Sequence, residues 1–209
     1  MEIRIAQGTE EWLRLRLGKI TASRMADVMA KTKSGPSASR KNYMMELICE
    51  KLSGESVEFY KNAAMQRGND LEPVARGAYE ADKGLFVVEE GLVDHPKIKG
   101  LAASPDGLVG DEGLLEIKCP NTATHLDFLK TSKIPSKYIL QMHTQMMCTG
   151  RNWCDFVSYD DRLQGLEYKC IRVYLDRQIA SHIIEEVSLF IENMNDELTE
   201  IEKLKEAMK

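Results

Sequence analysis

Three charged residues near the middle of the chain have the types and spacing needed for metal-dependent hydrolysis. Asp106 follows Ser104 and Pro105, and Glu116 and Lys118 come ten and twelve residues after it. Because alternate side chains of a strand share a face, Glu116 and Lys118 point to one place if 114–119 is a strand. Oxygen ligands in such a cluster suit Mg²⁺, which often takes only one or two carboxylates. The pattern therefore predicts phosphodiester hydrolysis, the alternative being a solvated strand of alternating charge.

The predicted metal ligands are the Asp106 and Glu116 carboxylates and the backbone carbonyl of Ile117, with Mn²⁺ as a substitute for Mg²⁺. Lys118 then positions or deprotonates a metal-bound water, or neutralises charge developing on the phosphate. Asp106 joins this face only if the turn before residue 114 has an odd length, since a one-residue change moves a side chain to the opposite face. We predict the odd turn, over 110–112 or 111–113.

The elements that must position these residues follow from hydrophobic periodicity and from Gly, Pro and capping residues. Helices are expected at 10–17, 24–30, 42–52, 63–83, 122–131 and 136–148, and strands at 86–88, 91–93, 100–104, 107–109, 114–119, 153–159 and 166–175. A long helix over about 176–208 carries an apolar stripe that packs on the core or on a neighbouring subunit. The order predicts one α+β (mixed α/β) domain over 1–209, with a central mixed sheet flanked by helices.

Composition excludes several classes of protein. The 209 residues are 43% hydrophobic and 29% charged, as in ordinary globular proteins. No apolar run approaches the roughly 20 residues that cross a membrane, and the first residues lack the pattern of a secretory signal. We therefore expect a cytoplasmic protein that does not bind membranes.

The net charge of −5 is unevenly distributed. Residues 1–61 carry +3 and residues 121–175 carry +2, whereas 62–120 and 176–209 carry −5 each. Local basic surfaces can bind DNA although the total charge is negative. The Gly-, Pro- and Ser-rich segment 31–40 is predicted to be a mobile loop whose Lys31, Lys33 and Arg40 hold a phosphate backbone without reading sequence.

The five cysteines are odd in number and form no CxxC pair, which predicts reduced thiols rather than disulfides or a zinc site. An iron–sulfur site is the open alternative, although its cysteine spacing matches no common cluster pattern; its ligands would be Cys49, Cys148, Cys154 and Cys170. The chain has no GxxxxGK[ST] loop, so ATP is not expected to be needed.

Several segments together resemble one known family. Asp106, Glu116 and Lys118 match the PD-(D/E)xK nuclease motif, and the chain is similar to the lambda-type alkaline exonucleases, also called YqaJ-like viral recombinases. The resemblance covers residues 12 to 145, and its segments are 12–23, 68–72, 103–108, 115–120 and 138–145. It implies a restriction-endonuclease-like PD-(D/E)xK core.

The resemblance also implies roles for residues that the bare sequence leaves open. Glu72 is implied to complete the acidic cluster as a second metal ligand or by orienting water, and Gln141 to lie beside the attacking water or the scissile phosphate. A second group is implied to form a pocket for a terminal 5′-phosphate, and its members are Arg16, Ser23 and Ser104.

The implied activity is a Mg²⁺-dependent, ATP-independent 5′-to-3′ exonuclease on linear double-stranded DNA. It would release mononucleotides and leave a 3′ single-stranded overhang, acting as a ring-shaped homotrimer with a phage-type single-strand annealing protein in recombination. A PD-(D/E)xK endonuclease or junction resolvase, and a catalytically silent DNA-binding protein, remain open alternatives.

Overall fold

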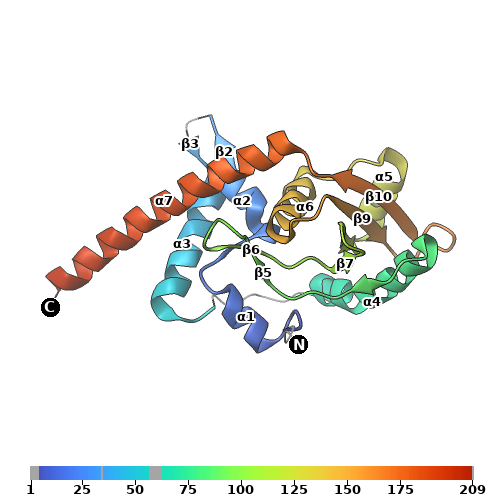
Figure 1. Ribbon diagram of the computed structural model, residues 1–209, viewed down its shortest axis with the longest axis horizontal. Helices are drawn as coiled ribbons and strands as arrows, with labels where there is room; N and C mark the ends of the chain where they lie inside the picture. The colour runs from blue at the N-terminus through green and yellow to red at the C-terminus, as the bar shows by residue number, and fades with distance from the viewer. Residues whose placement is uncertain (1–4, 34, 57–62, 209) are drawn as a thin grey trace.

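A five-stranded mixed sheet lies at the centre of the site-bearing part of the molecule (Figure 1). The computed structural model describes residues 5–33, 35–56 and 63–208. The strand order is β10-β9-β8-β7-β4, with β8 and β9 parallel and the other neighbours antiparallel. The strands are β4 (Val87–Val88), β7 (Gly107–Val109), β8 (Gly113–Lys118), β9 (Trp153–Tyr159) and β10 (Tyr168–Tyr174). The predicted mixed α+β fold is confirmed.

Helices cover both faces of this sheet because strand β8 is apolar on one face and half apolar on the other. Leu115 and Ile117 pack with Tyr79 of α4 (Ala63–Lys83). On the opposite face, Leu114 packs with Phe128 of α5 (Thr122–Thr131) and with α6 (Ser136–Thr149). Since parallel strands need a crossover connection, α5 and α6 join β8 to β9. Glu116 and Lys118 therefore face α6, as the alternation along β8 requires.

A second layer packs beside the sheet and carries the N-terminal part of the described chain. Its three-stranded sheet has the order β1-β6-β5, so the strands near 91–93 and 100–104 do not join the central sheet as predicted. The strands are β1 (Ile20–Thr21), β5 (Val93–Asp94) and β6 (Leu101–Ala103), and the helices are α1 (Glu10–Arg16), η1 (Ala22–Arg24), α2 (Met25–Met29) and α3 (Ala38–Ser53). The predicted central mixed sheet is present, but β5 and β6 pair with each other, and β6 also pairs with the short β1, a pairing that local periodicity does not encode.

Segment 31–40 differs from the predicted mobile loop. Strands β2 (Lys31–Thr32) and β3 (Gly35–Pro36) form a short hairpin, while Ser34 lies outside the described residues. Helix α3 begins at Ala38, earlier than predicted, because the Ser37 hydroxyl accepts a hydrogen bond from the Arg40 backbone N–H at 3.2 Å. A serine read as a loop residue is thus a helix cap.

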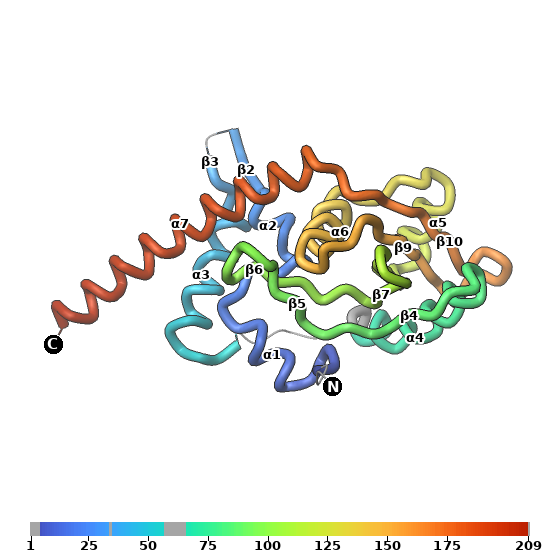
Figure 2. The backbone as a smooth tube through the Cα atoms, viewed as in Figure 1, coloured from blue at the N-terminus to red at the C-terminus, as the bar shows by residue number. Residues whose placement is uncertain are grey.

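The last helix, α7 (Arg177–Ala207), begins at the predicted cap Asp176, whose carboxylate accepts from two backbone N–H groups. Its first half packs on the core through Ile183, Val187 and Phe190. Beyond Met194 no residue of α7 is fully buried, and the helix projects past the core (Figure 2). Leu198 and Ile201 still pack partly against the core, so the expected packing on the core is seen for the helix up to residue 201. Across the described residues, no helix is long and apolar enough to span a membrane.

Candidate active site

The turn between β7 and β8 places Asp106 on the face of Glu116. Val109 pairs with Gly113 and Gly107 pairs with Leu115, so the turn comprises residues 110–112 and has the predicted odd length. Asp106 lies just before β7, and its carboxylate accepts a hydrogen bond from the Ile117 backbone N–H at 2.6 Å. The register prediction is confirmed, and Asp106 is tied to the strand that carries Glu116 and Lys118.

Glu116 is completely buried, and both oxygens of its carboxylate are bound by neighbouring side chains. The side-chain amide of Gln141 donates to Oε1 at 2.8 Å, and that of Gln145 donates to Oε2 at 2.6 Å. The Lys118 ammonium pairs with Oε1 of the same carboxylate. Gln141 lies at the site as the resemblance implied, whereas Gln145 was not predicted as a site residue. Its position one helical turn after Gln141 was the signal, since residues four apart share a helix face.

The carboxylates of the site repel one another. Burial raises the pKa of Asp106 well above its usual range, and the nearby Glu116 and Glu72 raise it further, against lowering by Lys118 and the Ile117 N–H. Burial alone would lower the pKa of Lys118, but Glu116 and Asp106 outweigh it and raise that pKa. Lys118 therefore stays positively charged. The carboxylates of the cluster still carry more negative charge than Lys118 neutralises.

Glu72 reaches the same cluster from helix α4. Burial raises its pKa, against lowering by Arg76 and by Lys118. One carboxylate oxygen accepts from Arg76 at 2.9 Å, and Arg76 also pairs with Glu89. Arg76 was not singled out in the sequence, although its spacing of one turn from Glu72 is the standard signal for a helical ion pair.

The donor set at Asp106 and Glu116 fits a hard dication. In the part of the chain that the structure describes, no three His, Cys, Asp or Glu side chains form a metal-binding group. Two carboxylates with a backbone carbonyl and water nevertheless satisfy Mg²⁺, and mutually repelling carboxylates gain from it. The residues therefore match the chemistry of the expected metal, with Asp106, Glu116 and the Ile117 carbonyl as the groups that would hold it.

A cavity of about 680 Å³ opens beside this cluster and is walled by Glu72 and Asp106 on one side. Trp12 and Arg16 of α1 line it as well. The Trp12 indole N–H donates to the Ser104 hydroxyl at 3.0 Å, and the Arg16 guanidinium lies 4.1 Å from the centre of the indole ring. Trp12 therefore brings two of the three predicted phosphate-pocket residues together, a role that the sequence analysis did not assign to it.

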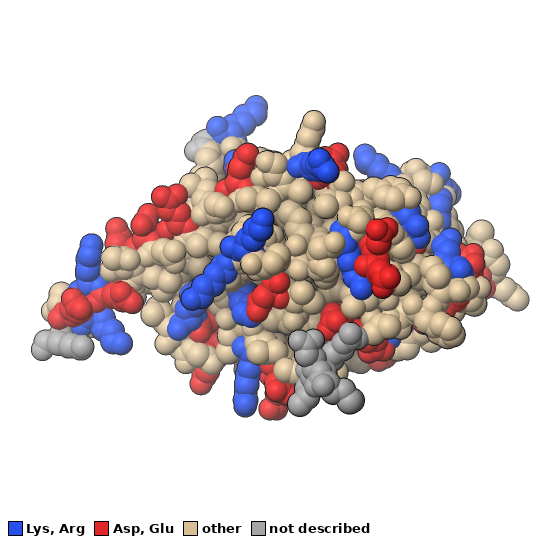
Figure 3. Space-filling view, viewed as in Figure 1, with Lys and Arg blue, Asp and Glu red and all other residues tan. Residues whose placement is uncertain are grey.

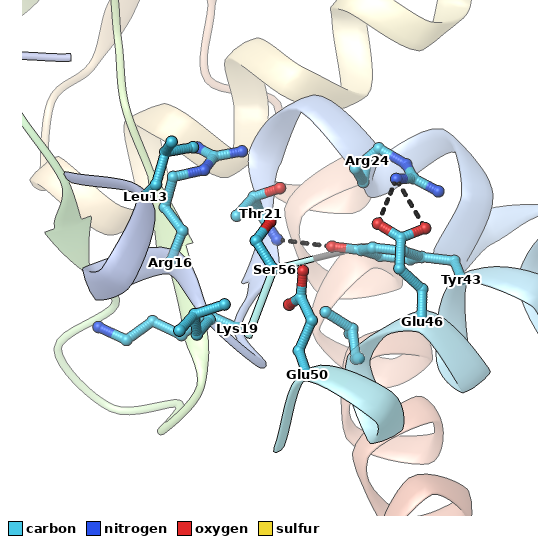
Figure 4. A pocket seen from close by; sticks show the side chains of 11 residues that line it. Leu13, Arg16, Lys19, Thr21, Arg24, Tyr43, Glu46, Glu50 and Ser56 are labelled. Atoms are coloured by element: carbon cyan, nitrogen blue, oxygen red, sulfur yellow. Dashed lines mark hydrogen bonds and ion pairs between the residues drawn. The ribbon is translucent and has the colours of Figure 1, made fainter. Parts of the chain in front are cut away.

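Arg16 also borders a smaller cavity of about 30 Å³ between α1 and α3 (Figure 4). There Arg24 is neutralised by Glu46, to which it donates at 3.0 Å. Burial lowers the pKa of Arg16. Ser23 lines neither cavity: it is exposed, lies inside the short η1 turn, and has its hydroxyl 3.4 Å from that of Thr21.

The three cations predicted to bind DNA have different surroundings. Lys33 is exposed. Lys31 is exposed too, but pairs with Glu186 of α7. Arg40 is only 2% exposed and donates to the backbone of Val28 and to Glu186. The expectation that Arg40 contacts DNA is wrong, because its guanidinium links α3 to α7 inside the fold.

The cysteines considered as iron–sulfur ligands are distributed over separate parts of the core. Cys148 packs with Leu47, Cys154 with Leu114, and Cys170 against Val157, while Cys49 is exposed. Burial raises the pKa of Cys148 to about 12 and that of Cys170 to about 11. Their placement in different clusters contradicts the iron–sulfur alternative.

The sequence and the fold of this chain are similar to those of known proteins. The family model for the YqaJ-like viral recombinase domain matches residues 11–152. The crystal structure of an alkaline exonuclease, LHK-Exo from Laribacter hongkongensis, is 53% identical, covers 96% of this chain and 100% of its own, and superposes with a TM-score of 0.90. The same exonuclease in complex with dAMP gives a TM-score of 0.91 at 53% identity, with 96% and 100% of the two chains covered.

More distant relatives share less. A phage-related exonuclease from Haemophilus somnus 129PT is 17% identical over 88% of this chain and 96% of its own, with a TM-score of 0.71, which shows likeness of fold alone. An uncharacterised protein, R354, of Acanthamoeba polyphaga mimivirus is 28% identical over 167 residues. That match takes in 72% of this chain but spans only 28% of the viral protein.

Proposed function

Because this chain belongs to the YqaJ-like viral recombinase family, we propose that it is a metal-dependent exonuclease that digests one strand of linear duplex DNA from the 5′ end. The observation that carries the proposal is that Asp106, which is hydrogen-bonded to the strand of Glu116 and Lys118, lines a cavity together with Arg16. Two acids, Glu72 and Asp106, and a side chain suited to phosphate, Arg16, thus line one cavity, and Lys118 lies on the strand behind Asp106. The 53% identity to an alkaline exonuclease supports the same class of activity.

The residues divide the work of hydrolysis among them. A Mg²⁺ or Mn²⁺ ion held by Asp106, Glu116 and the Ile117 carbonyl would supply an activated water and stabilise charge on the phosphate. Gln141 and Gln145 fix the Glu116 carboxylate in place. Lys118, kept charged by its neighbours, stabilises negative charge that develops on the phosphate. Glu72 orients water or binds a second ion.

Directionality comes from the other wall of the cavity. Arg16 presents a planar, forked donor to phosphate oxygens, next to the Ser104 hydroxyl. The family resemblance assigns Ser23 to the same subsite, although Ser23 lines neither cavity in the structure. A terminal 5′-phosphate held there sets the next bond against Asp106, so that mononucleotides are released and a 3′ overhang remains. No nucleotide-binding loop is present in the sequence, in keeping with an ATP-independent reaction.

The assembly follows the family resemblance. We propose a ring-shaped homotrimer around DNA that works in the cytoplasm with a phage-type single-strand annealing protein. Lys31 and Lys33 on the β2–β3 hairpin are exposed and contact the phosphate backbone. Arg40, which is buried, has no part in this contact.

The direct test compares linear and circular DNA. Purified protein is incubated with 5′-phosphorylated linear duplex and with covalently closed circular duplex, each with Mg²⁺ or with EDTA. We expect degradation of the linear duplex alone, and only with Mg²⁺. Cutting of the circle would identify an endonuclease or resolvase instead, and no hydrolysis of either substrate would identify a silent DNA-binding protein.

The phosphate subsite has its own test. Arg16→Ala should reduce the preference for 5′-phosphorylated over 5′-hydroxyl ends by about ten- to a hundredfold, since a charge-assisted contact is worth about 1.5–3 kcal/mol. Arg16→Lys should restore only part of the preference. The measurement is the initial rate on both substrates at one salt concentration, and equal slowing of both would show that Arg16 acts only through packing.

A further inference from the structure

The longest stretch of the chain without an acidic residue lies beside the active site, and its first part, before Gln141, has no role so far. Residues 128–154 contain no Asp or Glu, although the whole chain has 33 of them. Three lysines fall in the first part of this stretch, where α5 ends and α6 begins, and they are Lys130, Lys133 and Lys137. We call these three residues the lysine rim. All three are exposed, and among the described residues no carboxylate pairs with them.

The rim is close to the catalytic lysine. Lys118 Nζ lies 5.3 Å from the centre of the Tyr138 ring, and Lys137 Nζ lies 4.8 Å from the same point. The two ammonium groups are therefore within about 10 Å of each other, a few phosphates along a strand at about 3.4 Å of helix axis each. Tyr138 thus joins the rim to the site of hydrolysis.

The backbone that carries the rim is fixed rather than loose. Ser132 ends α5 in the left-handed conformation, with φ of 56°. The Lys169 ammonium donates to the Leu129 carbonyl and to the Ser132 hydroxyl, both at 2.7 Å. Ile134 packs into the cluster that contains Phe128. Because both sides of the connection are anchored, Lys130 and Lys133 keep their places on the surface.

The start of α6 adds to the positive potential. Its cap is Pro135, which makes no side-chain hydrogen bond to the first turn. The Tyr138 and Ile139 N–H groups donate to the Pro135 carbonyl, which leaves the Ser136 and Lys137 N–H groups at the positive end of the helix dipole of this 14-residue helix. Figure 3 shows several Lys and Arg side chains over α5 and the adjoining sheet, with some acidic side chains among them.

We propose that the lysine rim binds the phosphate backbone of the substrate DNA next to the bond that is cut. This inference rests on the proposed function and deepens it. Unpaired lysines act as point charges that hold phosphates without reading sequence, which suits an enzyme that must advance through any DNA. Arg24 and Arg40, by contrast, are each neutralised by a glutamate.

The test is the salt dependence of DNA binding, measured in EDTA so that nothing is hydrolysed. A triple variant, Lys130→Gln, Lys133→Gln and Lys137→Gln, is compared with wild type on a fluorescent 5′-phosphorylated duplex by anisotropy. Each lost phosphate contact lowers the slope of log affinity against log salt by about 0.9, so the slope should fall by about 2 to 3. Affinity at low salt should fall about tenfold or more.

Two control variants distinguish the positive charge of the lysine rim from the positive charge of the protein as a whole. Lys97, Lys99 and Lys203 are exposed lysines outside the rim, and their triple replacement by Gln should leave the slope at the wild-type value. Replacement of the rim lysines by Arg keeps the charge and should preserve the slope. Thermal unfolding of each variant checks that these surface changes leave the fold intact.

The possible results test the lysine rim separately from the proposed exonuclease activity. A wild-type slope in the Gln variant of the rim, or an equal fall in the control variant, would overturn the rim. A Gln variant that binds DNA normally but loses oligomeric mass in size-exclusion chromatography would overturn it too, by making the surface a subunit interface. Wild type that hydrolyses no DNA in Mg²⁺ would instead refute the proposed function, while the binding data would still decide for or against the rim.

Discussion

Two buried carboxylates lie on neighbouring strands of the central sheet and have opposite surroundings. Leu115 pairs with Asp155, and Glu116 pairs with Phe156, so Glu116 and Asp155 point to opposite faces. The Arg172 guanidinium donates to both oxygens of Asp155, at 2.8 Å each, and the Tyr79 hydroxyl donates at 2.8 Å. Asp155 is thus fully satisfied by a forked cation and a phenol.

Glu116 faces a different balance. Its partners are two neutral amides and one lysine, and that lysine also serves Asp106 and Glu72. The comparison teaches that burial of an acid does not by itself mark an active site. The mark is an excess of carboxylates over cations that the fold leaves uncorrected, because a ligand can then correct it.

The largest effect is expected from a substitution in the active site, around Glu116. Lys118→Ala removes the one cation shared by the acids and should slow hydrolysis by about 10²-fold or more, the usual cost of removing a preorganised charge at a transition state. The protein should still fold and bind DNA. Initial rates on linear duplex and anisotropy in EDTA measure the two properties, and activity within a few-fold of wild type would contradict the assigned role.

The second-largest effect is expected at Asp155, the carboxylate with a structural role. Asp155→Ala leaves Tyr79 and Arg172 without their acceptor and should lower the free energy of unfolding by about 2 kcal/mol, since Arg172 is partly exposed and can turn to water. Urea unfolding measures the change. Activity per folded molecule should stay near wild type in the cold, and a selective loss of rate without loss of stability would place Asp155 in the chemistry.

A smaller effect tests whether Mg²⁺ neutralises the excess of carboxylates over cations at the active site. Mg²⁺ at about ten times its dissociation constant should stabilise the native state by about 1.4 kcal/mol and raise the melting temperature by about 3–5 °C. Asp106→Asn should abolish this shift. In EDTA near neutral pH the variant should be at least as stable as wild type, because a carboxyl whose pKa is raised by folding loses stability as the pH rises from its unfolded pKa through its raised folded pKa.

The smallest effect is a difference in pH dependence between the two kinds of acid. Burial would raise the pKa of Asp160, but hydrogen bonds from Arg162 and Thr122 outweigh it and lower the pKa. A lowered pKa gives stability that is present above the unfolded value near 4 and is lost as the pH falls below it. Asp160→Asn should therefore flatten the acid limb of melting temperature against pH, and an unchanged limb would contradict this account.

Much of the active side of the comparison is predictable from sequence because it depends on local geometry. Alternation along a strand places Glu116 and Lys118 together, and an odd turn adds Asp106. The helices from 63 to 83 and from 122 to 131 were predicted with the bounds that the structure has. These features need only a few consecutive residues to specify them.

The remaining features depend on residues far apart in the chain. Arg40 lies in a basic segment, and only the arrival of Glu186 from α7 makes it a buried structural cation. Trp12 joins Arg16 to Ser104 across 92 residues. Neither contact has a local signature, so a basic or aromatic residue cannot be assigned a role until its distant partner is known.

The projecting half of α7 has a consequence for exchange of backbone hydrogens with solvent. Up to Met194 the helix is covered by the core, and from residue 202 to residue 208 every described side chain is exposed. An uncovered helical end of this length is marginal in water. Amide deuteration should therefore be slow in the part of the helix up to about residue 200 and fast beyond it. In an assembled oligomer, slow exchange beyond that boundary would map the surface that a neighbouring molecule covers.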